Sequence, residues 1–304
     1  MPKLVVTGAN GALGRVLVER ALARPGVELV ALVRSARAEA QLAPLASERV
    51  RVARVAWTDA AGLAGACAGA HGVLHLAGIL IPTKDEGYER ANVETTRSIC
   101  AAARAAGAGK FVLVSALFAD PESTNAYYAS KGRAEEVVRA AGLPYTIVRC
   151  PLLLACDSLG SHVLAKETKQ PVAILLAGGE NLEQPADARD VADAALNAGL
   201  DAARARDAAF DLVGPESLSR RELVARAARL RGKAPVVLPL PAAVVRLACG
   251  LRERLLGPGF SPDVLDVILE DVRLDSQPAA KALGVALTPL DATLQRTLEL
   301  EAAA

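Results

Sequence analysis

A glycine-rich turn near the N-terminus constrains the fold more than any other feature of this sequence. Residues 7–14 read TGANGALG, directly after a short apolar run and directly before a helix-like stretch. Gly8 permits a tight turn, Gly11 lets the backbone approach a pyrophosphate, and Gly14 lets the helix pack close to a sheet. The helix N-terminus then holds the anion. A glycine turn without a ligand is the alternative, but a turn between a strand and a helix favours dinucleotide binding. The candidate contacts are Gly8, Asn10, Gly11, Ala12, Leu13 and Gly14.

Apolar runs alternate with helical stretches through the first half of the chain. We expect strands at 3–7, 27–33, 50–56, 72–77, 110–115 and 145–149, and helices at 12–23, 60–68, 87–106 and 125–141. Continuous apolar strands with intervening helices predict an α/β fold with a doubly wound parallel sheet of the Rossmann type. Residues 1–150 form this dinucleotide-binding core.

The alternation of apolar runs and helical stretches becomes irregular after residue 150. We expect strands at 171–177 and 209–213, helices at 189–200 and 219–230, and a mostly helical tail from residue 235. Residues 151–304 are therefore expected to form a smaller substrate-side lobe that also contains late core elements. The boundary is soft, and the chain is expected to be one compact unit.

Charge and hydropathy exclude several classes of protein. Lysine and arginine total 35 against 34 acidic residues, so nucleic acid is not an expected partner. The longest apolar runs, 171–177 and 236–245, are too short or too broken by proline to span a bilayer. We expect 236–249 to bury against the end of the sheet, although it could touch a membrane or a partner. Stretches 91–106 and 134–141 permit a homodimer.

The cysteines and the first residues bear on the compartment. Five scattered cysteines and three histidines show no metal-ligand spacing, which favours reduced thiols and no metal site. The chain enters a strand at once, without a basic leader pattern. These features predict a cytoplasmic protein.

The end of the second strand bears on the type of nicotinamide cofactor. NAD-preferring folds place an acid there to hold the ribose 2′-hydroxyl. Here Arg34 and Ser35 occupy the position, and the first acid is Glu39. Arg34 can pair with a 2′-phosphate, and Ser35 or Arg37 can add hydrogen bonds, although Arg37 is also explained as a solvated loop charge. NADP(H) is therefore favoured over NAD(H).

A tyrosine and a lysine share one face of the helix expected at 125–141. Tyr127 and Lys131 are four residues apart in the segment YYASK. A tyrosine is a poor acid or base at neutral pH unless a cation stabilises its phenolate, which Lys131 can do. Tyr127 could then exchange a proton with a carbonyl or alcohol oxygen during hydride transfer. Tyr128 is the weaker candidate because Gly132 stands four residues on.

These motifs resemble those of the extended or atypical short-chain dehydrogenase/reductases. Further matching segments are HLAG at 75–78, NVETT at 92–96, FVLVS at 111–115, YTIVRCP at 145–151, ARDVA at 188–192 and FDLVGPESLSRRELV at 210–224. The tail segments LED at 269–271, ALG at 282–284 and TPL at 288–290 resemble the branch that includes the 39-kDa subunit of respiratory complex I. The resemblance implies cofactor contacts from Leu76, Ala77, Gly78, Lys131, Cys150 and Pro151.

The sequence departs from the family pattern at three positions. The family hydroxyl that holds the reacting oxygen is replaced by Leu117, leaving Ser115 as either a catalytic hydroxyl or a strand-end serine. The acidic contact to the adenine falls near Ala56 and Trp57, and a family glycine is Thr95. These losses indicate a divergent member.

Three functions stay open on this evidence. The first is an NADP(H)-dependent oxidoreductase that interconverts a carbonyl and an alcohol on a small, rather apolar substrate. Segments 79–83, 117–118 and 151–155 should face the nicotinamide, and they lack an arginine cluster for a nucleotide-sugar diphosphate. The second is an NADPH-binding structural or redox-regulatory protein without turnover, which tolerates Leu117. The third is an epimerase or dehydratase with recycled hydride.

Overall fold

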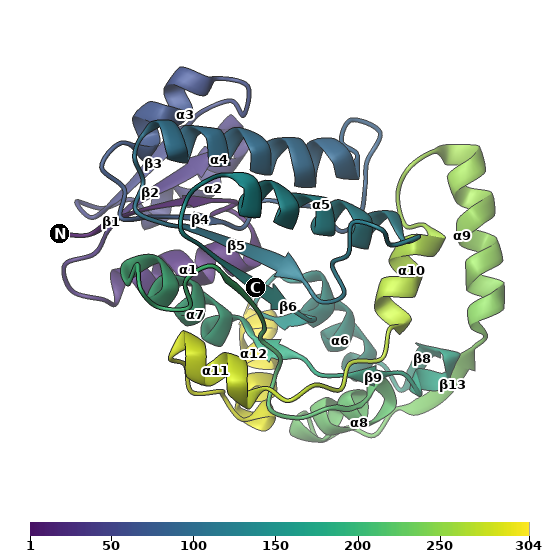
Figure 1. Cartoon of the computed structure of the whole chain (residues 1–304). Coiled ribbons are helices and arrows are strands. Elements are labelled where there is room, and N and C mark those ends of the chain that lie inside the picture. The colour runs from purple at the N-terminus through teal and green to yellow at the C-terminus, as the bar shows by residue number, and fades with distance from the viewer. Residues whose placement is uncertain (304) are drawn as a thin grey trace.

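A parallel sheet of seven strands forms the centre of the protein (Figure 1). The computed structural model describes residues 1–303. The strands lie in the order β11-β6-β5-β4-β1-β2-β3, and the expected doubly wound sheet is confirmed. Ligands of such sheets bind where the strand order reverses, which is at the carboxyl ends of β1 and β4. The bounds are β1 Lys3–Thr7, β2 Glu28–Val33, β3 Val50–Arg54, β4 Gly72–His75, β5 Phe111–Ala116, β6 Tyr145–Cys150 and β11 Ala208–Asp211.

Helices cover both faces of this sheet (Figure 1). Along β1, Leu4 and Val6 point into one buried cluster and Val5 into another, as the alternation of side chains along a strand requires. The first cluster includes residues of α1 (Ala12–Leu22), α2 (Ala36–Leu42), α7 (Ala188–Leu200) and α11 (Gln277–Leu283). The second includes residues of α3 (Ala60–Cys67), α4 (Thr95–Ala105) and α5 (Ala126–Ala140). Apolar strands buried on both sides explain the apolar runs of the sequence.

The crossover between β4 and β5 differs from its prediction. The strand expected at 72–77 ends at His75, because Ala77 turns to lie against the backbone of Gly8. The helix expected at 87–106 begins as the π-helix η2 (Glu89–Glu94) and continues as α4. The strand expected at 50–56 ends at Arg54.

Residues beyond 150 build a lobe over the carboxyl end of the sheet and also return to the sheet itself through α7 and β11. A third buried cluster joins α6 (Leu159–Lys169), α8 (Arg220–Leu230) and α12 (Leu290–Ala303). Short pairings connect β7 (Leu153–Leu154) with β10 (Ala186–Asp187), and β9 (Leu182–Glu183) with β12 (Leu218–Ser219). The short helices η1 (Ala43–Leu45) and η3 (Ala177–Gly179) complete the connections.

The tail from residue 235 is mostly helical, as expected, but it also contains a strand that was not expected. This strand, β13 (Val236–Leu240), pairs in parallel with β8 (Val172–Leu176) outside the main sheet. Prolines 239 and 241 exclude a helix there, and the valines favour a strand. The following helices are α9 (Ala242–Leu256) and α10 (Pro262–Leu269). The expected burial of 236–249 is wrong, because Cys249 is the one buried residue of α9.

No helix within residues 1–303 combines the length and apolar character needed to cross a bilayer.

Two glycines let α7 lie directly on β4, which generates a stability prediction. A Cβ at Gly72 would lie 2.6 Å from the carbonyl oxygen of Gly199, so the helix must move if one is added. We expect Gly72→Ala to lower the free energy of unfolding by about 1–3 kcal/mol in urea denaturation. Gly65→Ala in α3 is the matched control, since a Cβ there meets nothing within 4 Å. The control should gain about 0.5–1 kcal/mol. Equal effects at both positions would contradict this packing account.

Candidate functional site

The glycine turn between β1 and α1 forms the floor of the candidate site. Gly8 has φ +71°, and a Cβ there would lie 2.7 Å from the backbone nitrogen of Ala77. A Cβ at Gly14 would overlap the carbonyl oxygen of Gly8. The α1 N-terminus begins after Gly11 with no side-chain cap and no acid in its first turn. The turn therefore leaves room and N–H donors for a diphosphate, and these residues fit a dinucleotide.

Ser115, Tyr127, Lys131 and Cys150 gather at the carboxyl ends of β5 and β6. Asn125 caps α5 by accepting hydrogen bonds from the backbone nitrogens of Tyr127 and Tyr128, at 3.1 and 3.3 Å. This cap fixes where the helix starts and places Tyr127 in its first turn. Lys131 follows one turn later, and its Nζ donates to the carbonyl oxygen of Val114 at 3.2 Å.

A buried ion pair holds α5 on the sheet. Glu135 is fully buried and accepts hydrogen bonds from Arg149 of β6 at 2.6 and 2.8 Å, and from Arg139 at 2.8 Å. Because Glu135 lies one turn beyond Lys131, this pair fixes the height of the lysine along the sheet. Removing one partner of such a pair leaves an uncompensated buried charge, so the register of α5 is strongly specified.

Lys131 also reaches the loop after β4. A Cβ at Gly78 would lie 3.7 Å from the Lys131 Nζ and 2.9 Å from the Asn92 Oδ1. Gly78 therefore packs tightly against the Asn92 amide, and its lack of a side chain lets the Lys131 Nζ lie close to the backbone of this loop. The remaining Nζ donors can serve the hydroxyl groups of a ribose that binds along the loop.

Burial sets the protonation of these groups. Burial lowers the pKa of Lys131, while the neighbouring Cys150 and Glu135 act to raise it. Burial raises the pKa of the Cys150 thiol to about 11 despite the opposing effect of Lys131. Burial also raises the pKa of Tyr127 above its ordinary value, with further contributions from Cys150, Tyr128 and Tyr88. At neutral pH Tyr127 is therefore a protonated phenol, able to donate a proton.

The Ser115 hydroxyl is buried at the end of β5. Its Oγ is the one fully buried side-chain oxygen without a hydrogen-bond partner among the described residues. An unpaired buried hydroxyl costs about 1–3 kcal/mol, so the Ser115 Oγ is available to a ligand oxygen. Leu117, at the position where the resemblance implies a hydroxyl, is also buried.

Asn92 connects the β4 loop to α5, although the sequence identified it only as part of a motif. Its Oδ1 accepts from the backbone nitrogen of Ile79 at 2.9 Å, and its Nδ2 donates to the Ser130 Oγ at 2.9 Å. The π-helix η2 carries Asn92, and single π turns are frequent at functional sites. The Asn92 amide therefore holds the Gly78 loop and the Tyr127–Lys131 turn at a fixed separation.

His75 lies below this amide and is fully buried. Its Nε2 is 3.0 Å from the Thr96 Oγ1, which itself donates to the Asn92 carbonyl oxygen at 2.6 Å. Nε2 must therefore carry the proton, and Nδ1 accepts from the Thr7 hydroxyl at 2.6 Å. Burial, aided by the charge of Lys131, lowers the pKa of His75 to about 3. The neutral imidazole therefore has a structural role, connecting Thr7 of β1 to Thr96 of α4 through its two hydrogen bonds.

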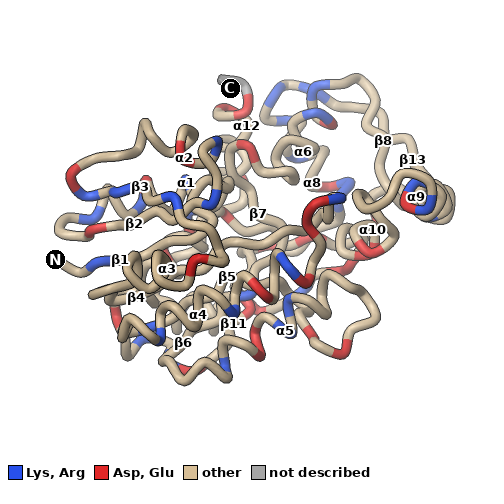
Figure 2. Tube along the Cα trace, turned by 90° about the horizontal axis from the view of Figure 1, so that it is seen from above, with Lys and Arg blue, Asp and Glu red and all other residues tan. Residues whose placement is uncertain are grey.

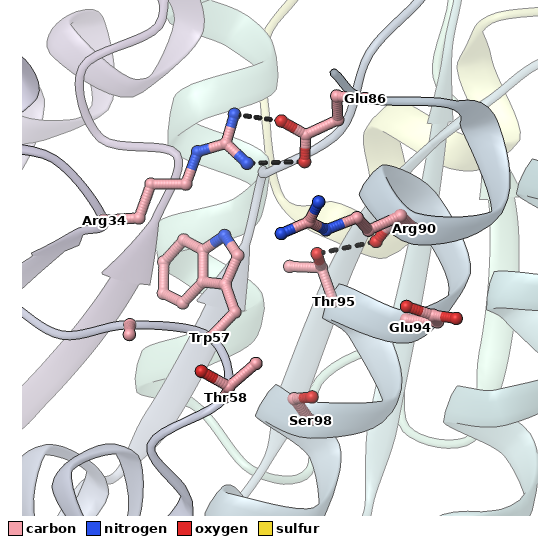
Figure 3. A pocket seen from close by; sticks show the side chains of 9 residues that line it. Arg34, Trp57, Thr58, Glu86, Arg90, Glu94, Thr95 and Ser98 are labelled. Atoms are coloured by element: carbon pink, nitrogen blue, oxygen red, sulfur yellow. Dashed lines mark hydrogen bonds and ion pairs between the residues drawn. The ribbon is translucent and has the colours of Figure 1, made fainter. Parts of the chain in front are cut away.

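A cavity of about 220 Å³ lies at the carboxyl ends of β2 and β3 (Figure 3). Both guanidinium ends of Arg34 pair with both oxygens of Glu86, and Trp57 lies beside this pair. The cavity is lined by Arg34, Ala56, Trp57, Thr58, Glu86, Arg90, Glu94, Thr95 and Ser98. Its place beside the glycine turn suits the adenine ribose of a dinucleotide. Sequence reasoning missed Glu86 and Arg90. An irregular loop brings Glu86 here, and η2, which directly follows that loop, carries Arg90.

The other residues predicted to contact the cofactor lie near the carboxyl ends of β2, β4 and β6. The Ser35 Oγ caps α2 by accepting from the Ala38 nitrogen at 3.2 Å. The Leu76 nitrogen donates to the Thr7 carbonyl oxygen at 3.2 Å, which places Leu76 beside the turn. Pro151 directly follows β6.

Outside the candidate site, Cys156, Asp157 and Glu301 bring potential metal-ligand atoms within 4.8 Å of one another. Arg15 pairs with Asp157 at 2.7 Å, so this carboxylate already has a partner.

Comparison with known proteins identifies relatives over most of the chain. Residues 8–198 match the protein family described as NAD(P)H-binding. A ceramide reductase of Caulobacter vibrioides is 37% identical over 177 residues, which cover 57% of this chain and 54% of that protein. The mitochondrial 40 kDa subunit of NADH-ubiquinone oxidoreductase from Neurospora crassa is 27% identical over 285 residues, 92% of this chain and 74% of the subunit. The chain therefore aligns with about half of the reductase.

Solved structures share the fold at low sequence identity. A UDP-glucuronic acid 4-epimerase from Bacillus cereus in complex with NAD has a TM-score of 0.78 and 16% identity, covering 99% of each chain. An NADPH-dependent quinone oxidoreductase from Escherichia coli complexed with NADPH has a TM-score of 0.73 and 23% identity, covering 96% of this chain and 99% of the other. The expected resemblance to a respiratory-chain subunit is confirmed. The solved structures confirm the fold alone.

The lowered pKa of His75 predicts a pH dependence of stability. Between the ordinary histidine pKa of about 6.5 and pH 3, the unfolded chain binds a proton that the folded chain does not. The contribution of His75 is complete above pH 6.5 and is lost as the pH falls. We expect wild-type protein to lose up to about 1.4 kcal/mol per pH unit in this window relative to His75→Gln, measured by urea denaturation. His162→Gln, at an exposed position, should leave the slope unchanged. Parallel slopes for all three proteins would contradict a neutral His75.

Proposed function

Because the chain belongs to the NAD(P)H-binding family, we propose that it is an NADP(H)-dependent oxidoreductase of the short-chain dehydrogenase/reductase type. It would interconvert a carbonyl and an alcohol on a small, rather apolar substrate. The observation that carries the proposal is the position of Tyr127 and Lys131 around Cys150 at the end of β6. The Lys131 Nζ donates to the Val114 carbonyl oxygen, and the next residue of β5 is Ser115, whose buried hydroxyl has no partner. A protein that only bound a nucleotide has no need of a phenol and an orphaned hydroxyl at that place.

Each of these side chains has a distinct part in the reaction. The nicotinamide supplies or accepts the hydride. Tyr127 donates a proton to the carbonyl oxygen in the direction of reduction. Its raised pKa opposes this transfer, so the phenolate that forms needs a stabilising positive charge. Lys131 holds ribose hydroxyls and provides positive charge beside the phenolate that forms. Ser115 donates to the same carbonyl oxygen and so gains the hydrogen bond that it lacks.

The surroundings of Tyr127 favour an apolar substrate. Leu117 is buried beside the site, and Phe118 is 40% exposed with φ +59°, so its ring is held out towards solvent. The segments expected to face the nicotinamide, 79–83, 117–118 and 151–155, contain no arginine. The similarity to a ceramide reductase supports a lipid-like carbonyl compound as the substrate class.

Arg34 and Glu86 together decide the preference between NADP(H) and NAD(H). Arg34 is a suitable partner for a 2′-phosphate, and Arg90 lines the same cavity. Glu86 opposes this preference, since it repels a phosphate and can accept from a 2′-hydroxyl. The Arg34 side chain is 48% exposed, and such surface pairs contribute only about 0–1 kcal/mol. A 2′-phosphate can therefore take the place of Glu86, which supports NADP(H).

A second candidate is an NADPH-binding structural or redox-regulatory protein without turnover. Leu117 favours it, because the usual hydroxyl is absent, and so does the similarity to a respiratory-chain subunit over most of the chain. This candidate predicts tight nucleotide binding with no substrate reduction.

Replacing Tyr127 tests for turnover. We expect Tyr127→Phe to lower kcat for NADPH-dependent reduction of a long-chain ketone by about 10²–10⁴-fold, with unchanged affinity for NADPH. The reaction is followed by the loss of NADPH absorbance. Tyr128→Phe is the matched control, since its neighbours are Phe118 and the lobe rather than Lys131, and it should retain most of the activity. Equal activity of wild type and Tyr127→Phe would overturn the catalytic role, and binding without turnover in wild type would favour the second candidate.

Replacing Arg34 and Glu86 tests the cofactor. We expect Arg34→Ala to weaken NADPH binding by about 10–100-fold in calorimetry, the worth of a hydrogen bond to a charged group, and to leave NADH binding unchanged. Glu86→Gln should tighten NADPH binding and weaken NADH binding. Arg37→Ala is the control, because Arg37 is exposed in the first turn of α2 and does not line the cavity. Stronger binding of NADH than NADPH by wild type would contradict the assignment.

A further inference from the structure

The outer face of α9 is aliphatic although it faces solvent. Val244, Leu247, Leu251 and Leu255 recur at helical spacing and are 57, 76, 56 and 70% exposed. The inner face of the same helix contains the buried Cys249 and Arg246, which pairs with Asp266 of α10. A surface helix of a protein surrounded by water has the opposite arrangement, with its apolar stripe inward.

The two-stranded ribbon that precedes α9 continues this aliphatic surface. Val172 pairs with Val236, and Ile174 pairs with Leu238, so all four side chains lie on one face of the ribbon. They are 39, 63, 61 and 49% exposed. Pro241 connects the ribbon directly to α9, and Figures 1 and 2 both show the two elements at one margin of the molecule. These four residues and the four of α9 are called the aliphatic edge below.

Positive charge is concentrated in the chain segment that contains most of the aliphatic edge. Residues 229–256 contain six arginines and lysines against one acid, Glu253, whereas the whole chain is nearly neutral. The acids Asp263 and Asp266 lie on α10, which packs against the inner face of α9. Arg229, Lys233, Arg252 and Arg254 are exposed and have no acidic partner among residues 1–303. Exposed aliphatic residues flanked by unpaired cations complement a bilayer surface with anionic head groups. A second copy of the chain would bring the same cations together.

The aliphatic edge also adjoins the candidate site. The helix α10 follows α9 and contacts the start of α5, where the Asn125 Nδ2 donates to the Asp263 carbonyl oxygen at 2.9 Å. The Asp263 carboxylate accepts from the Ala126 nitrogen at 3.2 Å. Asn125 is the cap that places Tyr127. The hairpin of α9 and α10 therefore runs from the aliphatic edge to the substrate side of the site.

We infer that the aliphatic edge docks on the surface of a lipid bilayer that contains anionic head groups. Val244, Leu247, Leu251 and Leu255 enter the boundary between head groups and acyl chains, and Arg252 and Arg254 contact the anionic groups. Docking does not require turnover, so it holds or fails independently of the proposed function. For an apolar substrate, it would bring the mouth of the site to the membrane where such a compound is dissolved.

Vesicle sedimentation with full-length protein tests this inference. We expect co-sedimentation with vesicles of phosphatidylcholine containing about one quarter phosphatidylglycerol, and weak binding to pure phosphatidylcholine. Added salt should reduce binding. The double variant Leu247→Ser, Leu251→Ser should lose at least about tenfold in the partition coefficient, since it removes aliphatic groups from the lipid. Arg252→Gln with Arg254→Gln should lose the preference for anionic vesicles.

Matched controls make each outcome decisive. Leu300→Ser changes a leucine that is 43% exposed on α12, away from the aliphatic edge, and should bind vesicles as wild type does. All variants should keep the wild-type unfolding transition and NADPH affinity, because the changed side chains face solvent. No sedimentation with either vesicle would overturn the inference. A stable dimer in sedimentation velocity that the leucine variants dissociate would also overturn it, since a second copy would then cover the surface.

Discussion

The close approach of two backbones at Gly8 and Ala77 is the constraint on which the rest of the site depends. It brings the end of β1 to the end of β4, and a Cβ at Gly8 would separate them. The same turn opens α1 with uncapped N–H groups, so the glycine that allows the packing also creates the anion site. From there the β4 loop continues to Gly78, which packs against the Asn92 amide and lies close to the Lys131 Nζ. Two positions that cannot carry a Cβ therefore fix the loop along which the proposed cofactor would bind.

Polar groups at the two ends of this path are satisfied to different degrees. At the nicotinamide end, Asn92, His75 and Thr96 form hydrogen bonds that fix the separation of the β4 loop from α5. Ser115 has no partner, which is the kind of local cost that a binding site retains for its ligand. At the adenine end, Arg34 and Glu86 satisfy each other at the surface. The polar groups at the proposed nicotinamide end are therefore preorganised. At the proposed adenine end, Arg34 must exchange Glu86 for a ligand group.

The sequence predicts the sheet well because each parallel strand is buried on both faces and reads as a continuous apolar run. The glycine turn is equally clear, since its function needs the same glycines that its conformation needs. Residues beyond 150 are harder to predict. The strand β13 contains a proline and pairs with β8 more than sixty residues earlier, and no local pattern predicts such a partner. The pairing of Glu86 with Arg34 could not be predicted from the local sequence either, because the loop after β4 brings the two residues together across more than fifty positions. The exposure of α9 is missed for a physical reason: an apolar stripe at helical spacing looks the same whether it faces a core or a membrane.

Cofactor choice in this site is a difference between two affinities rather than a property of Arg34 alone. Arg34 favours a 2′-phosphate, but Glu86 already occupies its guanidinium and must be displaced. Glu86 is less exposed than Arg34, at 14% against 48%, so the carboxylate loses less hydration when a ligand covers it. Arg90 lines the same cavity and can act in two ways. It can bind the 2′-phosphate together with Arg34, or it can pair with Glu86 once the phosphate has displaced that carboxylate from Arg34. Glu94 also lines the cavity, so with a bound 2′-phosphate two arginines would face two carboxylates and the phosphate. The proposed preference for NADP(H) therefore depends on Arg34 and Arg90 holding the phosphate more strongly than the two acids repel it.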